Sequence, residues 1–133
     1  MYVFISYSSK NSEDAYALKA LCEANGIHVW MAPDSISIGK SYMSEVPQAI
    51  ENCSCFIVLL TQESEAAHYV QCEVNWAMSS VPGRIMPISK GYLPTGALRF
   101  PLGNTQIRQV HQIDGSDADL LDTLRYIKEK MLQ

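Results

Sequence analysis

The chain has 133 residues, 47% of them hydrophobic and 18% charged, a balance that suits one globular domain with one core rather than a disordered segment. Its net charge of −4 and its lack of any Lys/Arg run argue against nucleic acid or a membrane surface as a partner. No apolar run approaches the ~20 residues that cross a bilayer, and strand-like sequence from Tyr2 leaves no room for a signal peptide. We expect one cytoplasmic domain over residues 1–133, compact enough to be one piece of a larger multidomain protein.

The first half of the chain alternates between strand-like and helix-like segments. Residues 3–5 form a short apolar run, which is typical of a strand buried on both faces. A helix is predicted from Asn11 or Ser12, either of which is a favourable N-cap, and Gly26 ends it. The next predicted elements are a strand, a polar loop and a helix, over residues 27–31, 32–40 and 44–52.

The second half continues this alternation. The near-continuous apolar residues 55–60 give the strongest strand pattern of the chain. Ser64 is expected to cap a helix that carries Glu73, and Ser116 is expected to cap the last helix. Between these two helices the sequence predicts a strand, a long irregular connection and an edge strand, over residues 84–89, 91–104 and 107–113.

Strands that alternate with helices indicate an α/β domain whose parallel sheet carries helices on both faces. Five strands in one small domain favour the flavodoxin-like, three-layer arrangement with strand order 2-1-3-4-5. In such folds ligands bind at the carboxyl ends of the strands, beside the switch point between strands 1 and 3. The loops that follow strands 1, 2 and 3 are therefore the first place to look for a site.

The residues at that edge exclude several chemistries known on this fold. A phosphorylated receiver domain needs carboxylates after strands 1 and 3, whereas those strands lead into Ser6-Tyr7-Ser8 and Thr61-Gln62. The loop over residues 8–12 has hydroxyls but no glycine, which disfavours a flavin phosphate site. Dinucleotide-binding Gly-x-Gly-x-x-Gly and Walker A motifs are absent from the sequence.

The four cysteines lie in or beside apolar segments and show no Cys-x-x-Cys spacing. This pattern predicts buried free thiols in a reducing compartment, for Cys22, Cys53, Cys55 and Cys72. His68 and Cys72 stand four residues apart on the predicted helix, but no third metal ligand is evident nearby, so no metal site is expected.

Glu73 is the candidate catalytic residue, because its helix is expected to face the carboxyl end of strand 1. Tyr69 precedes it by four residues and Trp76 follows it by three, so the three side chains share one helical stripe. An aromatic ring beside a carboxylate can hold a sugar or a flat heterocycle. Taken alone, a glutamate on a helix is more commonly a solvated surface charge.

Three segments resemble the signature boxes of Toll/interleukin-1 receptor/resistance (TIR) domains. Residues 4–7 (Phe-Ile-Ser-Tyr) before a polar loop and helix resemble the first box. Residues 26–30, a loop containing Gly39 and the helix after it resemble the family's second strand and its BB loop, here residues 32–42. The helix with Glu73 resembles the family's Ser-aromatic-Cys-Glu helix, with Tyr69 where a tryptophan is common. The boxes occur in order over residues 2–78, and the chain resembles a bacterial-type TIR domain.

The resemblance implies an enzyme that cleaves the nicotinamide N-glycosidic bond of NAD+, giving ADP-ribose or a cyclic isomer. It implies Glu73 as the catalytic carboxylate, NAD+ as substrate without any cofactor, and a role in immune signalling or antiviral defence. It also implies self-association through the BB loop, on which activity depends. The residues expected to bind the substrate are Phe4, Ser6, Tyr7, Trp30, Lys40 and Tyr69.

Two other functions stay open at this point. The resemblance equally covers TIR domains that only recruit other TIR domains, without turnover. A nucleotide-binding sensor is the third possibility. Glu73 with an aromatic residue four positions earlier favours the enzyme.

Overall fold

The computed structural model describes residues 1–132 and contains a five-stranded sheet in the order β2-β1-β3-β4-β5. Every neighbouring pair of strands in it is parallel. The predicted strand order and α/β class are therefore confirmed. The strands are β1 (Val3–Ser6), β2 (Val29–Trp30), β3 (Cys55–Leu59), β4 (Ile85–Ser89) and β5 (Arg108–Gln109).

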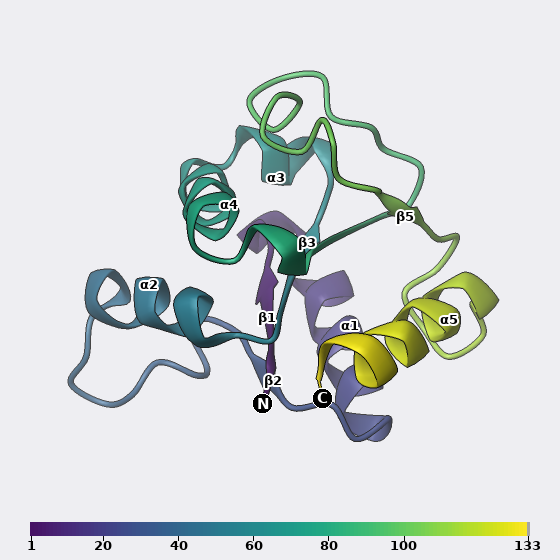
Figure 1. Cartoon of the computed structure of the whole chain (residues 1–133), viewed down its shortest axis with the longest axis horizontal. Coiled ribbons are helices and arrows are strands. Elements are labelled where there is room, and N and C mark those ends of the chain that lie inside the picture. The colour runs from purple at the N-terminus through teal and green to yellow at the C-terminus, as the bar shows by residue number, and fades with distance from the viewer. Residues whose placement is uncertain (133) are drawn as a thin grey trace.

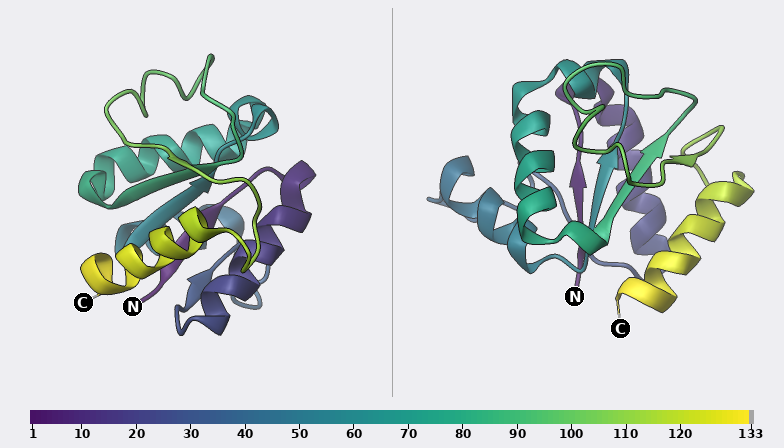
Figure 2. Two further views of the ribbon diagram at one scale, coloured as in Figure 1. Left: turned by 90° about the vertical axis from the view of Figure 1, so that its right-hand side faces the viewer. Right: turned by 45° about the horizontal axis from the view of Figure 1, so that its top comes forward.

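Helices cover both faces of the sheet and make three layers (Figures 1 and 2). α1 (Ser12–Ala24) and α5 (Ala118–Tyr126) lie on one face, and α2 (Tyr42–Asn52) and α4 (His68–Ser80) lie on the other. The short helix α3 (Gln62–Ala66) precedes α4. Three further short helical segments lie at Ser9–Asn11, Pro82–Arg84 and Ile127–Met131.

The central strands divide the core in two because successive side chains of a strand point to opposite faces. Val3 and Ile5 of β1 pack with Leu18 of α1 and Leu120 of α5. Phe4 points the other way and packs among side chains of α2 and α4. All five residues of β3 are buried, as expected for a strand covered by helices on both faces.

The helix that carries Glu73 starts later than its sequence indicates. Ser64 does not cap it: Thr61 caps α3, and Ser64 stands at the third position of that helix, where the two side chains bond each other's backbone N–H. Ala67 is extended and separates α3 from α4. No Gly or Pro marks this break in the sequence, and the Gln71 side chain donates to the Glu65 carbonyl across it.

α2 starts two residues earlier than predicted, at Tyr42. Ser41 is its N-cap, and the Ser41 and Ser44 side chains form a reciprocal capping box. The earlier start places Pro47 in the second turn rather than the first. It also makes Tyr42 the first helical residue, with a fixed direction for its side chain.

The last helix is capped by Asp117, not by Ser116. The Asp117 carboxylate accepts from the backbone N–H of Leu120 at 2.8 Å and from those of His111 and Gln112 at 2.7 and 3.0 Å. These bonds hold the pKa of Asp117 below its ordinary value. Ser116 instead bonds Asp114 within the preceding turn.

Between β4 and β5 the chain runs without helix or strand, as predicted for residues 91–104. One buried carboxylate, Glu65 of α3, holds this connection. It accepts from the N–H groups of Thr95 at 3.0 Å, Gly96 at 2.7 Å and Leu98 at 2.9 Å, and from the Tyr92 hydroxyl. Beyond the connection, β5 covers only two of the seven residues predicted as an edge strand.

Replacing Glu65 by glutamine should lower the free energy of unfolding at pH 7 by about 1–3 kcal/mol, because the buried N–H groups lose a charged acceptor. Burial by itself raises the pKa of Glu65, but its hydrogen bonds outweigh burial and hold the pKa below 4.5. This stabilisation is present above pH 4.5 and is lost as the pH falls through the folded-state pKa. Urea denaturation at several pH values measures this stabilisation, with Glu129→Gln at an exposed position as the control. If the difference in unfolding free energy between Glu65→Gln and wild type were the same at low pH as at pH 7, the prediction would be contradicted.

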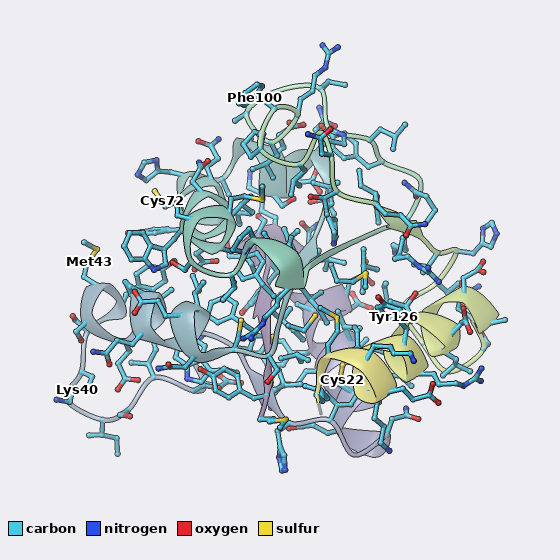
Figure 3. The ribbon with its side chains drawn as sticks, viewed as in Figure 1. Cys22, Lys40, Met43, Cys72, Phe100 and Tyr126 are labelled. Carbon is cyan, nitrogen blue, oxygen red and sulfur yellow. The ribbon has the colours of Figure 1, made fainter. Side chains whose placement is uncertain are left out.

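Three of the four cysteines are buried as predicted, and burial raises the pKa of Cys22 to about 12 and that of Cys53 to about 11. The prediction is wrong for Cys72, which is exposed on the outer side of α4 (Figure 3). The buried side of that helix is formed by Val70, Glu73, Val74 and Ala77 instead. Within residues 1–132, no group of three His, Cys, Asp or Glu side chains is arranged to hold a metal ion, and no helix has the length and apolar character needed to cross a membrane.

Candidate active site

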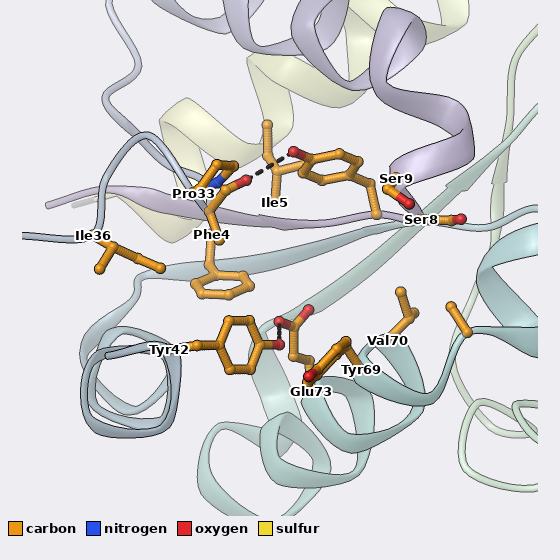
Figure 4. A pocket seen from close by; sticks show the side chains of 13 residues that line it. Phe4, Ile5, Ser8, Ser9, Pro33, Ile36, Tyr42, Tyr69, Val70 and Glu73 are labelled. Carbon is orange, nitrogen blue, oxygen red and sulfur yellow. Dashed lines mark hydrogen bonds between the residues drawn. The ribbon is translucent and has the colours of Figure 1, made fainter. Parts of the chain in front are cut away.

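A cavity of about 330 Å³ opens at the carboxyl ends of β1 and β3, at the switch point of the sheet (Figure 4). β1 and the loop after it form one wall, and α4 forms another. The loop between β2 and α2 closes a third side with Ala32, Pro33 and Ile36. Most of the lining is apolar, with Glu73 as its one carboxylate among the residues that the structure describes.

Glu73 projects from α4 into this cavity and is only 8% exposed. Its Oε1 accepts a hydrogen bond of 2.6 Å from the hydroxyl of Ser6, the last residue of β1. Its Oε2 accepts from the phenol of Tyr42, the first residue of α2. Side chains from three separate elements therefore meet at one carboxyl group.

Burial raises the pKa of Glu73, and the hydrogen bonds from Ser6 and Tyr42 oppose that rise by favouring the charged form. The same arrangement acts on Tyr42, whose pKa is strongly raised by burial and by the nearby Glu73 charge. The phenol consequently stays protonated and remains a donor at every pH near neutrality.

Aromatic rings form much of the cavity's surface. The Phe4 ring lies between those of Trp30 and Phe56, with centroid distances of 5.2 and 5.4 Å and nearly parallel planes. Figure 4 shows the ring on the side of the cavity next to Tyr42 and Glu73. Tyr69 is 63% exposed at the rim of the cavity. Its ring packs against that of Tyr42, with a distance of 4.8 Å between the ring centroids.

The structure brings together most of the residues predicted for the site. Phe4, Tyr7, Tyr69 and Glu73 line the cavity. Ser6 is buried beneath it and reaches Glu73 through its hydroxyl. The Tyr7 hydroxyl donates to the Ala32 carbonyl at 2.8 Å, which ties the end of β1 to the start of the loop after β2.

Besides Ser6, two predicted residues lie outside the cavity lining. Trp30 is half-buried and stacks on Phe4 as part of the core between β1 and α2. Lys40 is exposed on the loop that leads to α2 (Figure 3) and does not line the cavity. Their contacts with a substrate stay predictions.

Tyr42 is the residue that sequence reasoning missed. The sequence places it at the end of the region that resembles the BB loop, and it is 31 positions from Glu73. A local signal, the capping box of Ser41 and Ser44, marks Tyr42 as the first residue of a helix, but it carries no information on the contact with Glu73.

A second hollow of about 280 Å³ lies between α2 and α4 and is almost wholly apolar. Tyr42, Tyr69 and Glu73 line both this groove and the cavity, and so form the partition between them. The exposed Cys72 also lines it, with its Sγ 3.5 Å from the His68 ring.

Comparison with known proteins agrees with this architecture. The sequence pattern of the TIR domain family matches residues 3–125. The TIR domain of the Toll-related receptor TRR-2 from Hydra magnipapillata superposes with a TM-score of 0.71 at 20% identity, over 100% of both chains. The TIR domains of the activated Roq1 resistosome, which recognises the pathogen effector XopQ, superpose with a TM-score of 0.61 at 16% identity, over 100% of this chain and 74% of that one.

Among curated proteins, no sequence matches significantly. At these identities the solved structures establish the fold, whereas the family assignment rests on the pattern that spans nearly the whole chain. With a parallel sheet in the order 2-1-3-4-5 and this pattern over residues 3–125, the chain belongs to the TIR domain family.

Proposed function

We propose that this TIR domain is an NAD+ nucleosidase that cleaves the bond between nicotinamide and ribose. One observation carries the proposal: a buried carboxylate, Glu73, with a hydroxyl donor on each oxygen, faces a cavity at the switch point of the sheet. Ligands of this fold class bind at that place.

A single carboxylate is enough for this reaction. Ordinary glycosidases use two, because a poor leaving group must be protonated as it departs. In NAD+ the nicotinamide nitrogen is cationic, so the bonding electron pair leaves with a neutral nicotinamide and no acid is required. The carboxylate has only to bind ribose hydroxyls and to stabilise positive charge on the ribosyl carbon.

The surroundings of Glu73 suit that role. Apolar side chains exclude water around the carboxylate, which strengthens its interaction with a developing cation. Tyr69 and Tyr42 offer ring surfaces beside it for a flat heterocycle. The ribosyl cation is then attacked either by water, which loses a proton and gives ADP-ribose, or by the adenine of the same molecule, which gives a cyclic isomer.

The test is incubation with NAD+ followed by chromatography of the products. Equal amounts of nicotinamide and ADP-ribose identify a hydrolase, and a cyclic isomer in place of ADP-ribose identifies a cyclase. NAD+ that stays intact at high protein concentration would overturn the proposal.

The alternative is a module that only binds other TIR domains. It is favoured by the loop between β2 and α2, where Ile38 is fully exposed beside Gly39 and Lys40. An apolar side chain held in water at a loop tip suits contact with a second copy. The same loop supports the proposal that an active enzyme works as an assembly. The chain's membership of the TIR family supports a proposed role in immune signalling, which we extend to antiviral defence.

We therefore expect the NAD+ cleavage rate per molecule to rise about tenfold or more between about 1 and 100 μM protein, because self-association follows mass action. Ile38→Glu should remove most of this rise, since a charge replaces the exposed apolar side chain at the loop tip. Initial rates over a dilution series, with sedimentation at the same concentrations, measure both effects. A rate per molecule that is high and independent of concentration would contradict the requirement for assembly.

A further inference from the structure

We propose that Tyr42 is a positioning residue for Glu73, whose phenol O–H holds the carboxylate oxygen Oε2 at the cavity and links it to the first turn of α2. The inference rests on the proposed function of Glu73. It adds a residue that lies at the end of the BB loop region and to which the family resemblance gave no role at the site.

The geometry assigns the two carboxylate oxygens to different elements. Oε1 is held by Ser6, whose position is fixed because β1 is buried in the middle of the sheet. Oε2 is held by Tyr42, whose position depends on where α2 begins. The carboxylate is thus fixed at two points, and only one of them belongs to the rigid sheet.

The start of α2 is in turn fixed by the loop before it. Ser41 caps the helix, and the backbone N–H of Ser37 donates to the carboxylate of Glu45 in the first turn at 3.3 Å. The Tyr42 ring packs on Tyr69 of α4, so its hydroxyl reaches Glu73 from a supported position. A movement of residues 32–41 that shifts this first turn also moves the donor on Oε2.

Losing the phenol O–H leaves a buried carboxylate with one donor instead of two. Among residues 1–132, no lysine or arginine lines the cavity or the adjoining groove to take its place: Ser6 and Tyr7 approach from β1 and the loop after it, and Tyr69 and Cys72 from α4. His68 also lines the adjoining groove, bonded to Cys72. The hydrogen bond from Tyr42 would then no longer oppose the effect of burial on Glu73, and the protonated form of Glu73 becomes more favourable.

Tyr42→Phe tests the proposal, because it keeps the ring and its contact with Tyr69 and removes only the donor. The acidic limb of the kcat–pH profile for NAD+ cleavage should move up by about one to two pH units, as expected when a charged group loses a hydrogen bond. Activity should fall about tenfold or more on that limb and return to within about threefold of wild type at higher pH.

Two controls separate this effect from general damage. Tyr2→Phe removes another phenol that binds α2, through the Ala49 carbonyl at 2.7 Å, without touching Glu73, and should leave the profile unchanged. His68→Gln removes the imidazole that lines the adjoining groove and should likewise leave the profile unchanged; an acidic limb that moves with His68→Gln as far as with Tyr42→Phe would overturn the inference.

A second readout does not need turnover. Titration of the Glu73 carboxyl carbon by ¹³C NMR should give a pKa for Tyr42→Phe about one to two units above wild type. If wild type leaves NAD+ intact, the proposed function fails and this titration still decides the role of Tyr42. Equal Glu73 titrations in both proteins, or a variant that is faster at every pH, would overturn the inference.

Discussion

Replacing Glu73 by glutamine should abolish NAD+ cleavage while the protein stays folded. Glutamine fills the same volume and keeps one oxygen to accept from Ser6 or Tyr42, but it removes the negative charge that stabilises the ribosyl cation. Losing one preorganised electrostatic contact commonly costs about 10²–10³ in rate, and here the whole charge is lost, so the decrease should be at least about 100-fold.

The fold should tolerate this change because it removes a buried charge rather than creating one. Glu73 is nine-tenths buried, and a neutral amide there avoids the cost of desolvating an ion. Thermal unfolding should therefore occur at the wild-type temperature or above. The rate is measured by release of nicotinamide, with the surface substitution Glu129→Gln as a matched control that keeps full activity. Wild-type turnover in a folded Glu73→Gln protein would remove Glu73 from the mechanism.

Phe4→Ala is the second large effect, and we expect it on stability. The Phe4 ring is 1% exposed and stacks on both Trp30 and Phe56, so its removal leaves a cavity in the middle of the sheet. Truncating a buried phenylalanine costs about 3–5 kcal/mol, and the lost ring contacts add to the transfer term. A domain of this size is stable by about 5–15 kcal/mol, so much of the margin disappears.

Urea denaturation measures this loss, with Phe100→Ala as the matched control. Phe100 is 95% exposed at the connection between β4 and β5, and its truncation should change stability by no more than about 0.5 kcal/mol. A loss below about 1 kcal/mol for Phe4→Ala would mean that the ring serves the cavity wall rather than the core. The larger loss that we expect would show that the stacked Phe4 ring is part of the core.

The sequence alone predicts the layers of this protein because they depend on local periodicity. The apolar run at residues 55–60 is typical of a buried strand, and the alternation of such runs with helices predicts a parallel sheet that would bind a ligand at the switch point. The boundaries were less well predicted. Capping depends on which of several adjacent polar residues reaches the free N–H groups, as Thr61 does in place of Ser64 and Asp117 in place of Ser116.

The candidate site likewise contains some features that the sequence predicts and others that it does not. Glu73 and Ser6 stand out in the sequence because each lies in a segment that resembles a family box, and the structure joins them by a hydrogen bond. The exposure of Cys72 was mispredicted, because its apolar neighbourhood in sequence does not show which side of α4 faces the sheet.

The fold class, the strand order and the edge of the sheet at which Glu73 lies could be predicted from the sequence, since these follow from periodicity and chain connectivity. The way in which the Glu73 carboxylate is held could be seen only in the packed structure. Tyr42 reaches Glu73 across 31 residues because packing of α2 against α4 sets their separation. The loop over residues 90–107 converges on Glu65 because a buried charge must find donors wherever the chain brings them. Such pairings depend on distances between elements, which no local pattern encodes.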